Sequence, residues 1–160
     1  MTRIGHGFDV HALTERRPLV LGGVTVPSER GLAGHSDADV LAHALMDAIL
    51  GAMRAGDIGQ LFPDTDPAFE EADSMVLLSR VASLAREQGF SLIDADCTVA
   101  AQTPKLAPYR EQMRQTMAHA MDVDVSQVGV KATTTEHLGF VGREEGIAAW
   151  AVVLLDRAMP

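Results

Sequence analysis

The sequence predicts an α/β fold of the α+β type, in which a single mixed β-sheet carries helices packed on one face. Three observations predict it. Strand-like segments interleave with segments of helical periodicity, an order that favours one sheet with helices on a face. The 160 residues are 47% hydrophobic and 22% charged, a globular composition that excludes a disordered chain, a collagen or a coiled coil. The length fits a single domain over residues 1–160 with chain enough to bury a core.

The first half of the chain holds two expected strands and two expected helices. Arg3–Ala12 has strand character interrupted by two glycines, and Leu19–Leu21 is a short apolar strand that runs through a Gly-Gly turn and continues at residues 24 and 26. A helix is expected over Ser36–Arg54, because a serine followed three places later by an acid is a capping box. A Gly-, Asp- and Pro-rich loop over 56–67 separates it from a second helix, Ala68–Gln88, which Gly89 ends.

The second half of the chain predicts three strands and one helix. Leu92–Ala101 alternates apolar and polar residues, the pattern of a strand. A third helix begins near Pro108 and carries a stripe that we interpret as core, because methionine is a flexible filler of apolar space; its members are Tyr109, Met113, Met117 and Met121. Val128–Ala132 and Ile147–Leu155 are apolar runs of strand length.

Charge and cysteine content exclude several classes of partner and location. The formal net charge is −9, from 22 acidic and 13 basic residues, so we expect no nucleic-acid partner. A single cysteine, Cys97, allows no disulfide within the chain and suits a reducing compartment. Met1–His6 lacks a signal pattern, and the longest apolar run, Ala148–Leu155, is too short to span a bilayer. We expect a cytoplasmic protein with no membrane partner.

Three residues have the types and spacing of a metal site. Asp9 and His11 lie two apart on an expected strand, so both side chains point to one face. In the first helix, His43 lies one turn from Asp39 and from Asp47. Two histidines and one aspartate with an open fourth position describe a catalytic zinc site. The alternative is a turn acid beside a surface histidine, with a separate core histidine held by a neighbouring acid.

Two further segments have side chains that suit phosphate. A helix beginning at Ser36 would present free N–H groups to an anion beside His35, or else Ser36 only caps the helix and His35 is solvated. Thr133–Thr135 offer hydroxyls to a diphosphate and Glu136 offers a carboxylate to a hard cation such as Mg²⁺, or else the threonines are a β-branched strand end.

Two loops remain open to both kinds of interpretation. Lys105, in the turn before the third helix, either meets a phosphate or is solvated. The carboxylates of Asp57–Gly59 and Phe62–Asp66 either bind sugar hydroxyls or cap helices and form Asx-turns.

Five separated motifs lie between Arg3 and about Leu155: Ile4–His11, His35–Leu45, Gly56–Gly59, Leu61–Asp66 and Lys131–Arg143. In sequence and in order they resemble the family of 2-C-methyl-D-erythritol 2,4-cyclodiphosphate synthases of the non-mevalonate isoprenoid pathway. Five motifs in order are far more specific than one, and they favour the functional interpretations over the structural ones.

The resemblance implies a homotrimer with active sites between adjacent subunits. It implies that Asp9, His11 and His43 bind zinc or a similar divalent ion. It also implies that Glu136 helps to bind a second ion, Mg²⁺ or Mn²⁺, through the substrate diphosphate.

The resemblance also implies roles toward the substrate. His35 and Thr134 match positions that stabilise the transition state, and Ser36 matches a phosphate contact. Phe140 and Arg143 match further binding positions at or near the trimer's central cavity. The remaining matches are Asp9 and His11; on the methylerythritol side Asp57, Ile58, Gly59, Phe62, Asp64 and Asp66; and in the cytidine and diphosphate pocket of the neighbouring subunit Ala101, Thr103, Pro104, Lys105, Leu106, Ala107, Thr133, Thr134, Thr135 and Glu136.

The implied reaction converts 4-diphosphocytidyl-2-C-methyl-D-erythritol 2-phosphate to the cyclic diphosphate with release of CMP. Two rivals are open. One is a zinc-dependent phosphoesterase that uses metal-bound hydroxide, and the other is a trimeric binding module that senses isoprenoid diphosphates around Phe140 and Arg143. The product formed from the cytidyl substrate separates all three.

Overall fold

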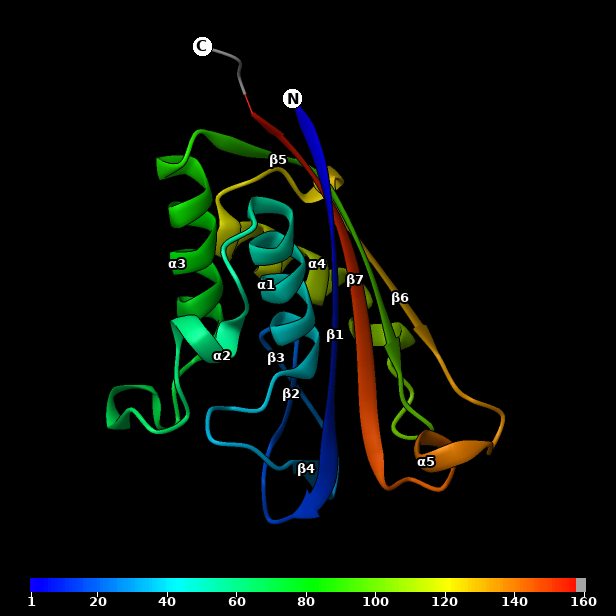
Figure 1. Cartoon of the computed structure of the whole chain (residues 1–160). Helices are drawn as coiled ribbons and strands as arrows, with labels where there is room; N and C mark the ends of the chain where they lie inside the picture. The colour runs from blue at the N-terminus through cyan, green and yellow to red at the C-terminus, as the bar shows by residue number, and fades with distance from the viewer. Residues whose placement is uncertain (158–160) are drawn as a thin grey trace.

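The computed structural model describes residues 1–157 (Figure 1). Its strands are β1 (Thr2–Glu15), β2 (Leu19–Leu21), β3 (Val24–Val26), β4 (Arg30–Leu32), β5 (Phe90–Ala100), β6 (Val128–Thr133) and β7 (Gly146–Arg157). Its helices are α1 (Val40–Met53), α2 (Ile58–Leu61), α3 (Ser74–Glu87), α4 (Arg110–Met121) and α5 (Gly139–Gly142), with 3-10 turns at Pro67–Phe69, Ala107–Tyr109 and Val125–Gln127.

The main sheet is mixed and five-stranded, with the strand order β4-β1-β7-β5-β6. β1 is antiparallel to β4 and β7, and β5 is antiparallel to β7 but parallel to β6. A parallel pair needs a long crossover, and α4 lies in the segment that joins β5 to β6. The expectation of a single sheet was wrong in one respect, because β2 and β3 pair with each other in a separate two-stranded sheet.

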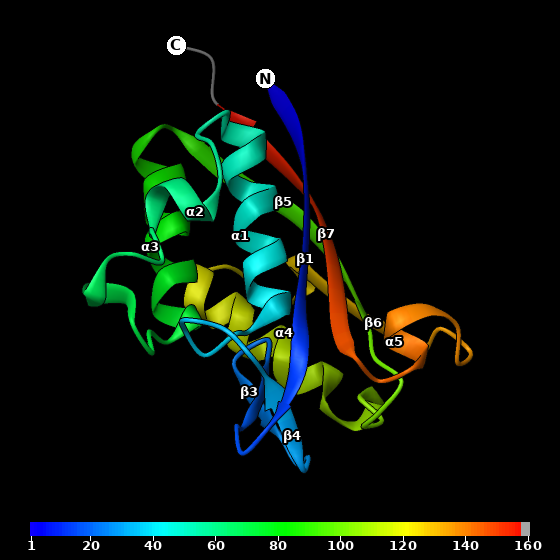
Figure 2. The same ribbon diagram turned by 60° about the horizontal axis from the view of Figure 1, so that its bottom comes forward.

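Helices α1, α3 and α4 lie on one face of the main sheet, and α1 occupies the middle of this layer (Figures 1 and 2). Nearly all of its 14 residues are buried, which agrees with a helix that is apolar on every side and is enclosed by other elements. Within residues 1–157, no helix combines the length and the apolar character that a membrane crossing requires.

Two glycines let α1 pack directly on the sheet backbone. A Cβ added to Gly5 would lie 1.8 Å from the carbonyl oxygen of Ala48, and one added to Gly7 would lie 1.9 Å from that of Ala44. Side chains alternate along a strand, so Gly5, Gly7, Asp9 and His11 all face α1. We call these four residues the glycine–ligand column.

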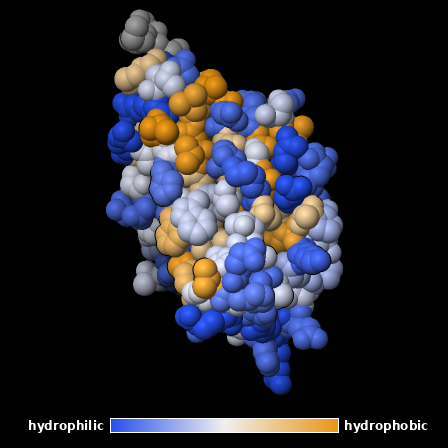
Figure 3. Space-filling view, turned by 90° about the vertical axis from the view of Figure 1, so that its right-hand side faces the viewer, coloured by the Kyte–Doolittle hydropathy of each residue, from blue (hydrophilic) through white to orange (hydrophobic). Residues whose placement is uncertain are grey.

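The opposite face of the sheet is left open. Most of the large side chains of β1 and β7 that point away from the helices are apolar, with His6 as a polar exception among them, and exposed fractions are 37–64% at Ile4, Phe8, Val10, Trp150, Val152 and Leu154. We call these six residues the open sheet face. Figure 3 looks onto this side, where apolar patches lie among polar side chains. Phe8 and Trp150 are paired across the strands with ring centroids 5.3 Å apart.

Several helix boundaries differ from the expected ones. α1 begins at Val40 and its N-cap is Asp39, not Ser36, because the Asp39 carboxylate accepts the N–H of Ala42. α3 begins at Ser74 with Asp73 as N-cap, six residues later than expected. The loop before it contains α2, and neither α2, α5 nor β4 was expected.

The other expectations for the elements are confirmed. The four predicted long strands are present, each within a few residues of its expected bounds or extended beyond them. In α4 the methionine stripe faces the core, with Met113, Met117 and Met121 at most 1% exposed.

Candidate active site and metal centre

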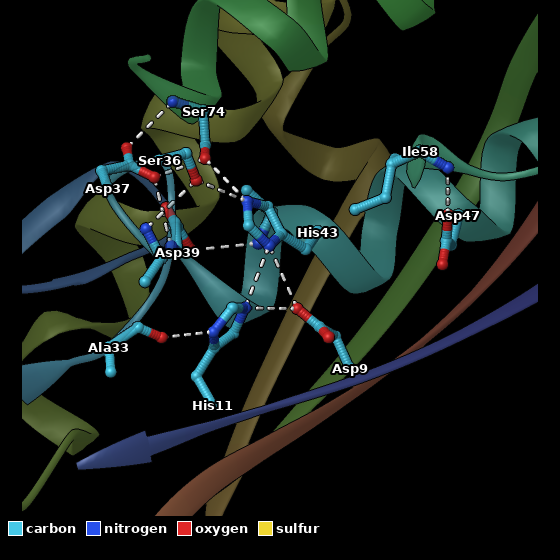
Figure 4. A network of polar contacts seen from close by, with 12 residues as sticks. Asp9, His11, Ala33, Ser36, Asp37, Asp39, His43, Asp47, Ile58 and Ser74 are labelled. Carbon is cyan, nitrogen blue, oxygen red and sulfur yellow. Dashed lines mark hydrogen bonds and ion pairs between the residues drawn. The ribbon is translucent and has the colours of Figure 1, made fainter. Parts of the chain in front are cut away.

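Asp9 and His11 on β1 and His43 on α1 each direct one ligand atom to a common point (Figure 4). Asp9 Oδ2 lies 2.9 Å from His11 Nε2 and 3.1 Å from His43 Nδ1. The two ring nitrogens are 3.2 Å apart. The i, i+2 spacing therefore placed both β1 side chains on the same face, as expected. Ligand atoms around a tetrahedral zinc lie about 3.3 Å apart, so these three atoms fit such an ion.

The hydrogen bonds on the far side of each ring fix which nitrogen carries the proton. His11 Nδ1 lies 2.7 Å from the carbonyl oxygen of Ala33, which can only accept, so in the neutral ring Nδ1 carries the hydrogen and Nε2 has a lone pair. His43 Nε2 lies 3.1 Å from Ser74 Oγ, whose own hydrogen is donated to Asp37. The hydrogen of His43 is therefore on Nε2, and Nδ1 has a lone pair. Two lone pairs and a carboxylate oxygen converge, which is the donor set of a bound cation.

The pKa shifts describe the same cation-attracting environment. Without an ion, a proton on His11 Nε2 or His43 Nδ1 can take its place and hydrogen-bond to Asp9. Burial raises the pKa of Asp9, but these hydrogen bonds outweigh burial and leave the pKa of this carboxyl well below its ordinary value. Burial lowers the pKa of His11, but the hydrogen bond and the charge of Asp9 outweigh it and raise this pKa. Asp9 is thus a carboxylate at any ordinary pH, and it stabilises positive charge beside it.

Asp39 and Asp47, the acids one turn from His43 in the sequence, bind backbone N–H groups and do not hold the ring of His43. The Asp39 carboxylate accepts the N–H groups of Gly22 at 2.8 Å and Gly23 at 2.7 Å in addition to its capping bond, and so joins the β2–β3 turn to α1. Burial raises the pKa of Asp39 to about 6, against these backbone donors that lower it. Asp47 accepts the N–H of Ile58 at 2.8 Å and holds the start of α2.

The metal cluster lies in the wall of a cavity of about 230 Å³. The predicted substrate residues that line it are His35, Ser36, Ile58, Gly59, Phe62 and Asp64. Residues Gly34, Met46, Phe69 and Leu77 also line it, and these were not predicted. Met46 and Leu77 occupy buried helical positions that look like ordinary core in the sequence, and no pattern distinguishes them.

His35 has the most unusual environment in this cavity. Its Nε2 is buried and has no hydrogen-bond partner among residues 1–157. An unsatisfied buried polar atom costs free energy, so this atom in a cavity wall is a candidate partner for a bound ligand. Since α1 begins at Val40, the expected helix N-terminus beside His35 and Ser36 is not present.

A second hollow, of about 180 Å³, lies at the carboxyl ends of β5 and β6. Of the residues proposed for substrate binding, Ala101, residues 104–107, Thr133 and Thr134 line it, together with Gln102 and Ala132. Gln102 accepts the N–H of His137 at 3.1 Å and thereby orders the loop after β6. Strands β7 and β5 separate this hollow from β1, so one chain does not bring Thr134 and Glu136 to the metal cluster.

The other predicted residues lie outside both hollows. Asp57 and Asp66 accept the N–H groups of Gln60 and Ala68, so within one chain they act as helix caps, which was the alternative interpretation. Arg143 forms an ion pair with Glu145 at 3.0 Å. The remaining members of this set are Thr103, Thr135, Glu136 and Phe140, of which Thr103, Glu136 and Phe140 are exposed.

A larger cavity of about 530 Å³ lies at the other end of the helical layer. Phe90, Met121 and Leu155 are among its apolar lining residues. The volume of a cavity does not by itself identify an active site. The possible metal-binding cluster found in residues 1–157 lines the smaller cavity of about 230 Å³.

Comparison with known proteins identifies the family of this chain. Residues 2–156 match the model of the YgbB family. A curated 2-C-methyl-D-erythritol 2,4-cyclodiphosphate synthase from Geobacillus kaustophilus (strain HTA426) is 64% identical over 158 residues, which cover 99% of this chain and all of the relative.

Solved structures show the same fold. A 2C-methyl-D-erythritol-2,4-cyclodiphosphate synthase in its CDP-bound form is 40% identical with a TM-score of 0.88, and the match covers 96% of this chain and 100% of that one. The bifunctional IspDF from Campylobacter jejuni is 51% identical with a TM-score of 0.95; the match covers 99% of this chain and 43% of that longer protein. The chain belongs to the YgbB family, together with the 2-C-methyl-D-erythritol 2,4-cyclodiphosphate synthases.

Proposed function

We propose that the chain converts 4-diphosphocytidyl-2-C-methyl-D-erythritol 2-phosphate to 2-C-methyl-D-erythritol 2,4-cyclodiphosphate and CMP, by divalent-metal-assisted intramolecular phosphoryl transfer in the non-mevalonate pathway. Membership of the synthase family supports the reaction, and CDP in a related structure supports a cytidyl ligand. The observation that carries the proposal is the convergence of Asp9, His11 and His43 in a cavity wall.

The reaction needs no protein nucleophile. The 2-phosphate oxygen of the substrate forms a bond to the β-phosphorus, and the bond from that phosphorus to CMP breaks. Holding a tethered nucleophile in line is worth roughly 7–11 kcal/mol, so positioning carries most of the catalysis. A divalent ion, when bound, supplies positive charge that offsets the negative charge on the phosphoryl oxygens.

The residues of the first cavity have separate tasks in this mechanism. Asp9, His11 and His43 hold the ion, for which zinc is the proposed metal. The buried Nε2 of His35 offers a hydrogen bond to a phosphoryl oxygen, and the Ser36 hydroxyl contacts the same group. Asp64 offers its carboxylate to the sugar hydroxyls. Phe62, Ile58 and Gly59, with the nearby Asp57 and Asp66, complete the proposed methylerythritol side.

The second hollow is the proposed cytidine and diphosphate pocket. Thr133 to Thr135 offer hydroxyls, Lys105 offers positive charge, and Glu136 is the proposed partner of a second ion, Mg²⁺ or Mn²⁺. Thr134 is the proposed second stabiliser of the transition state. Residues 101 and 103–107 form the remainder of the proposed base pocket, and Phe140 and Arg143 are proposed as further binding positions. Because the two hollows lie apart within one chain, a neighbouring copy must bring the second to the first.

The proposed assembly is therefore a homotrimer with shared active sites. The open sheet face supports it, since an exposed cluster of large apolar side chains is typical of an interface.

Sedimentation should give the mass of three 17.1-kDa chains. Val152→Asp on this face should produce monomers and abolish turnover, because the interface would bury the new carboxylate, whose cross-strand neighbours are His6 and Asp96. Val76→Asp, at a 50%-exposed position on α3, is the matched control. A fully active wild-type monomer contradicts the shared site.

Two further proposals concern the chain as a whole. We regard residues 1–160 as one synthase domain, acting in the cytoplasm without nucleic-acid or membrane partners. Cys97 is a free, buried thiol, which suits a reducing compartment. Burial raises its pKa to about 12, so it has no nucleophilic role in the reaction.

The product decides between the synthase and its two rivals. Mass spectrometry of the cytidyl substrate after incubation should show the cyclic diphosphate and CMP, and removal of divalent ions with a chelator should stop their formation until ions are restored. Linear methylerythritol phosphates would identify a phosphoesterase, because hydrolysis adds water. Unchanged substrate, with binding alone, would identify a binding module.

A further inference from the structure

A second layer of polar side chains lies behind the metal cluster, and the reaction as described gives it no role. Ser74, the first residue of α3, is 0% exposed, and with Asp39 and His43 it is one of three buried polar or charged residues found within residues 1–157. A buried hydroxyl is costly unless it is fully hydrogen-bonded. Its partners therefore show what holds it there.

Ser74 forms a link between a carboxylate and a metal ligand. Its Oγ donates to Asp37 Oδ1 at 2.5 Å, and its backbone N–H donates to Asp37 Oδ2 at 2.9 Å (Figure 4). The same Oγ lies 3.1 Å from His43 Nε2. Since its only hydrogen is donated to Asp37, the hydroxyl can only accept from His43.

This arrangement controls the ligand atom of His43. With the hydrogen held on Nε2, the lone pair is on Nδ1, which faces Asp9 and His11 at 3.1 and 3.2 Å. Ser36 Oγ also lies 3.2 Å from Nε2, but Ser36 lines the cavity and is the proposed phosphate contact. Ser74 lies behind the ring, so substrate does not compete for it.

The same residues hold the loop that carries His35 and Ser36. The N–H of Asp37 donates to the carbonyl of Ala72 at 3.3 Å, and the N–H of Glu71 donates to the carbonyl of His35 at 2.9 Å. With the two bonds between Asp37 and Ser74, four hydrogen bonds join the loop to residues 71–74, just before and at the start of α3.

We propose that Asp37 and Ser74 are positioning residues of the metal centre, acting as a carboxylate–hydroxyl–imidazole chain that orients His43 and selects its metal-binding tautomer. The inference rests on the proposed metal centre and deepens it. Partners behind metal-bound histidines set the ring orientation and basicity and are worth about 10–100-fold in metal affinity. Neither residue touches the proposed substrate positions.

The test measures zinc binding rather than turnover. Purified, metal-free protein is titrated with Zn²⁺ against a chromophoric chelator at fixed pH, and thermal unfolding of the metal-free protein is recorded in parallel. Ser74→Ala should weaken zinc binding about 10–100-fold. Ser79→Ala, on the same helix and outside the network, is the matched control and should leave binding unchanged. Ser74→Thr, which keeps the hydroxyl, should restore affinity to near the wild-type value.

A second variant tests the carboxylate. Asp37→Asn removes the charge with little change of size and should weaken zinc binding in the same direction. Because both residues act through one chain of hydrogen bonds, the double variant should be little worse than Ser74→Ala alone. If Ser74→Ala does not fold, Asp37→Asn decides the question.

The outcomes separate this inference from the proposed function. Zinc affinity within about twofold of wild type in a folded Ser74→Ala or Asp37→Asn variant overturns the positioning role, whatever happens to thermal stability. A wild-type chain that binds no zinc overturns the zinc centre and this inference together. A wild type that binds zinc but forms no cyclic product overturns the reaction and leaves the inference standing.

Discussion

Replacement of His43 with alanine is expected to abolish CMP release. The substitution removes one of three converging donor atoms, and a site with only Asp9 and His11 has lost the ligand contributed by α1. Because partners behind the ligands are already worth about 10–100-fold, loss of a ligand itself should lower activity by more than about 100-fold. Zinc content by elemental analysis and CMP release by chromatography measure the two effects.

The control for this prediction is His119→Ala. His119 is an exposed histidine on α4, far along the chain from the cluster, and its loss should change neither metal content nor rate. A His43→Ala protein that retains stoichiometric zinc and full CMP release would show that the metal centre is wrongly assigned. Thermal unfolding of both variants without metal separates loss of the ion from loss of the fold.

Gly7→Ala is expected to prevent stable folding. The added Cβ would lie 1.9 Å from the carbonyl oxygen of Ala44 and 2.8 Å from the amide nitrogen of Ala48, both backbone atoms of α1. Neither can move without lifting the helix from the sheet. We expect a loss of more than about 4 kcal/mol in the free energy of unfolding, the range reached by few single substitutions. Chemical denaturation, or failure of soluble expression, measures it.

Gly51→Ala is the matched control for the glycine prediction. Gly51 lies within α1 itself, and the nearest atom to an added Cβ is 3.9 Å away, so a methyl group fits. Alanine is preferred over glycine inside a helix by about 1 kcal/mol, so this variant should be at least as stable as wild type. A Gly7→Ala protein with an unchanged unfolding midpoint would contradict the direct backbone packing of α1 on β1.

Periodicity in the sequence predicted much of this fold and the centre of its site. The alternation of a strand is enough to put Asp9 and His11 on one face, whatever the exact ends of β1. The prediction that the methionine stripe of α4 faces the core is equally independent of the exact helix ends, because three residues at intervals of four share a face wherever the helix begins. The family motifs supplied what periodicity lacks, the association of His43 with the β1 pair.

The starts of helices could not be predicted in the same way. Ser36 and Asp39 are both good cap residues, and the local pattern does not choose between them. The choice falls on Asp39 because its carboxylate also accepts the N–H groups of Gly22 and Gly23, which lie far away in the sequence. The Asp37–Ser74 bonds likewise join residues 37 positions apart, and no local pattern contains them.

The glycine–ligand column has a consequence for how the family can vary. Packing and chemistry occupy alternate residues of one strand, first Gly5 and Gly7, then Asp9 and His11. One inserted or deleted residue between Gly7 and Asp9 would turn both ligands out to the open sheet face, since a slip of one position exchanges the faces of a strand. The same alternation of faces along β1 therefore determines both the packing of α1 and the positions of the metal ligands. Natural variation in this stretch should proceed by substitution and not by change of length.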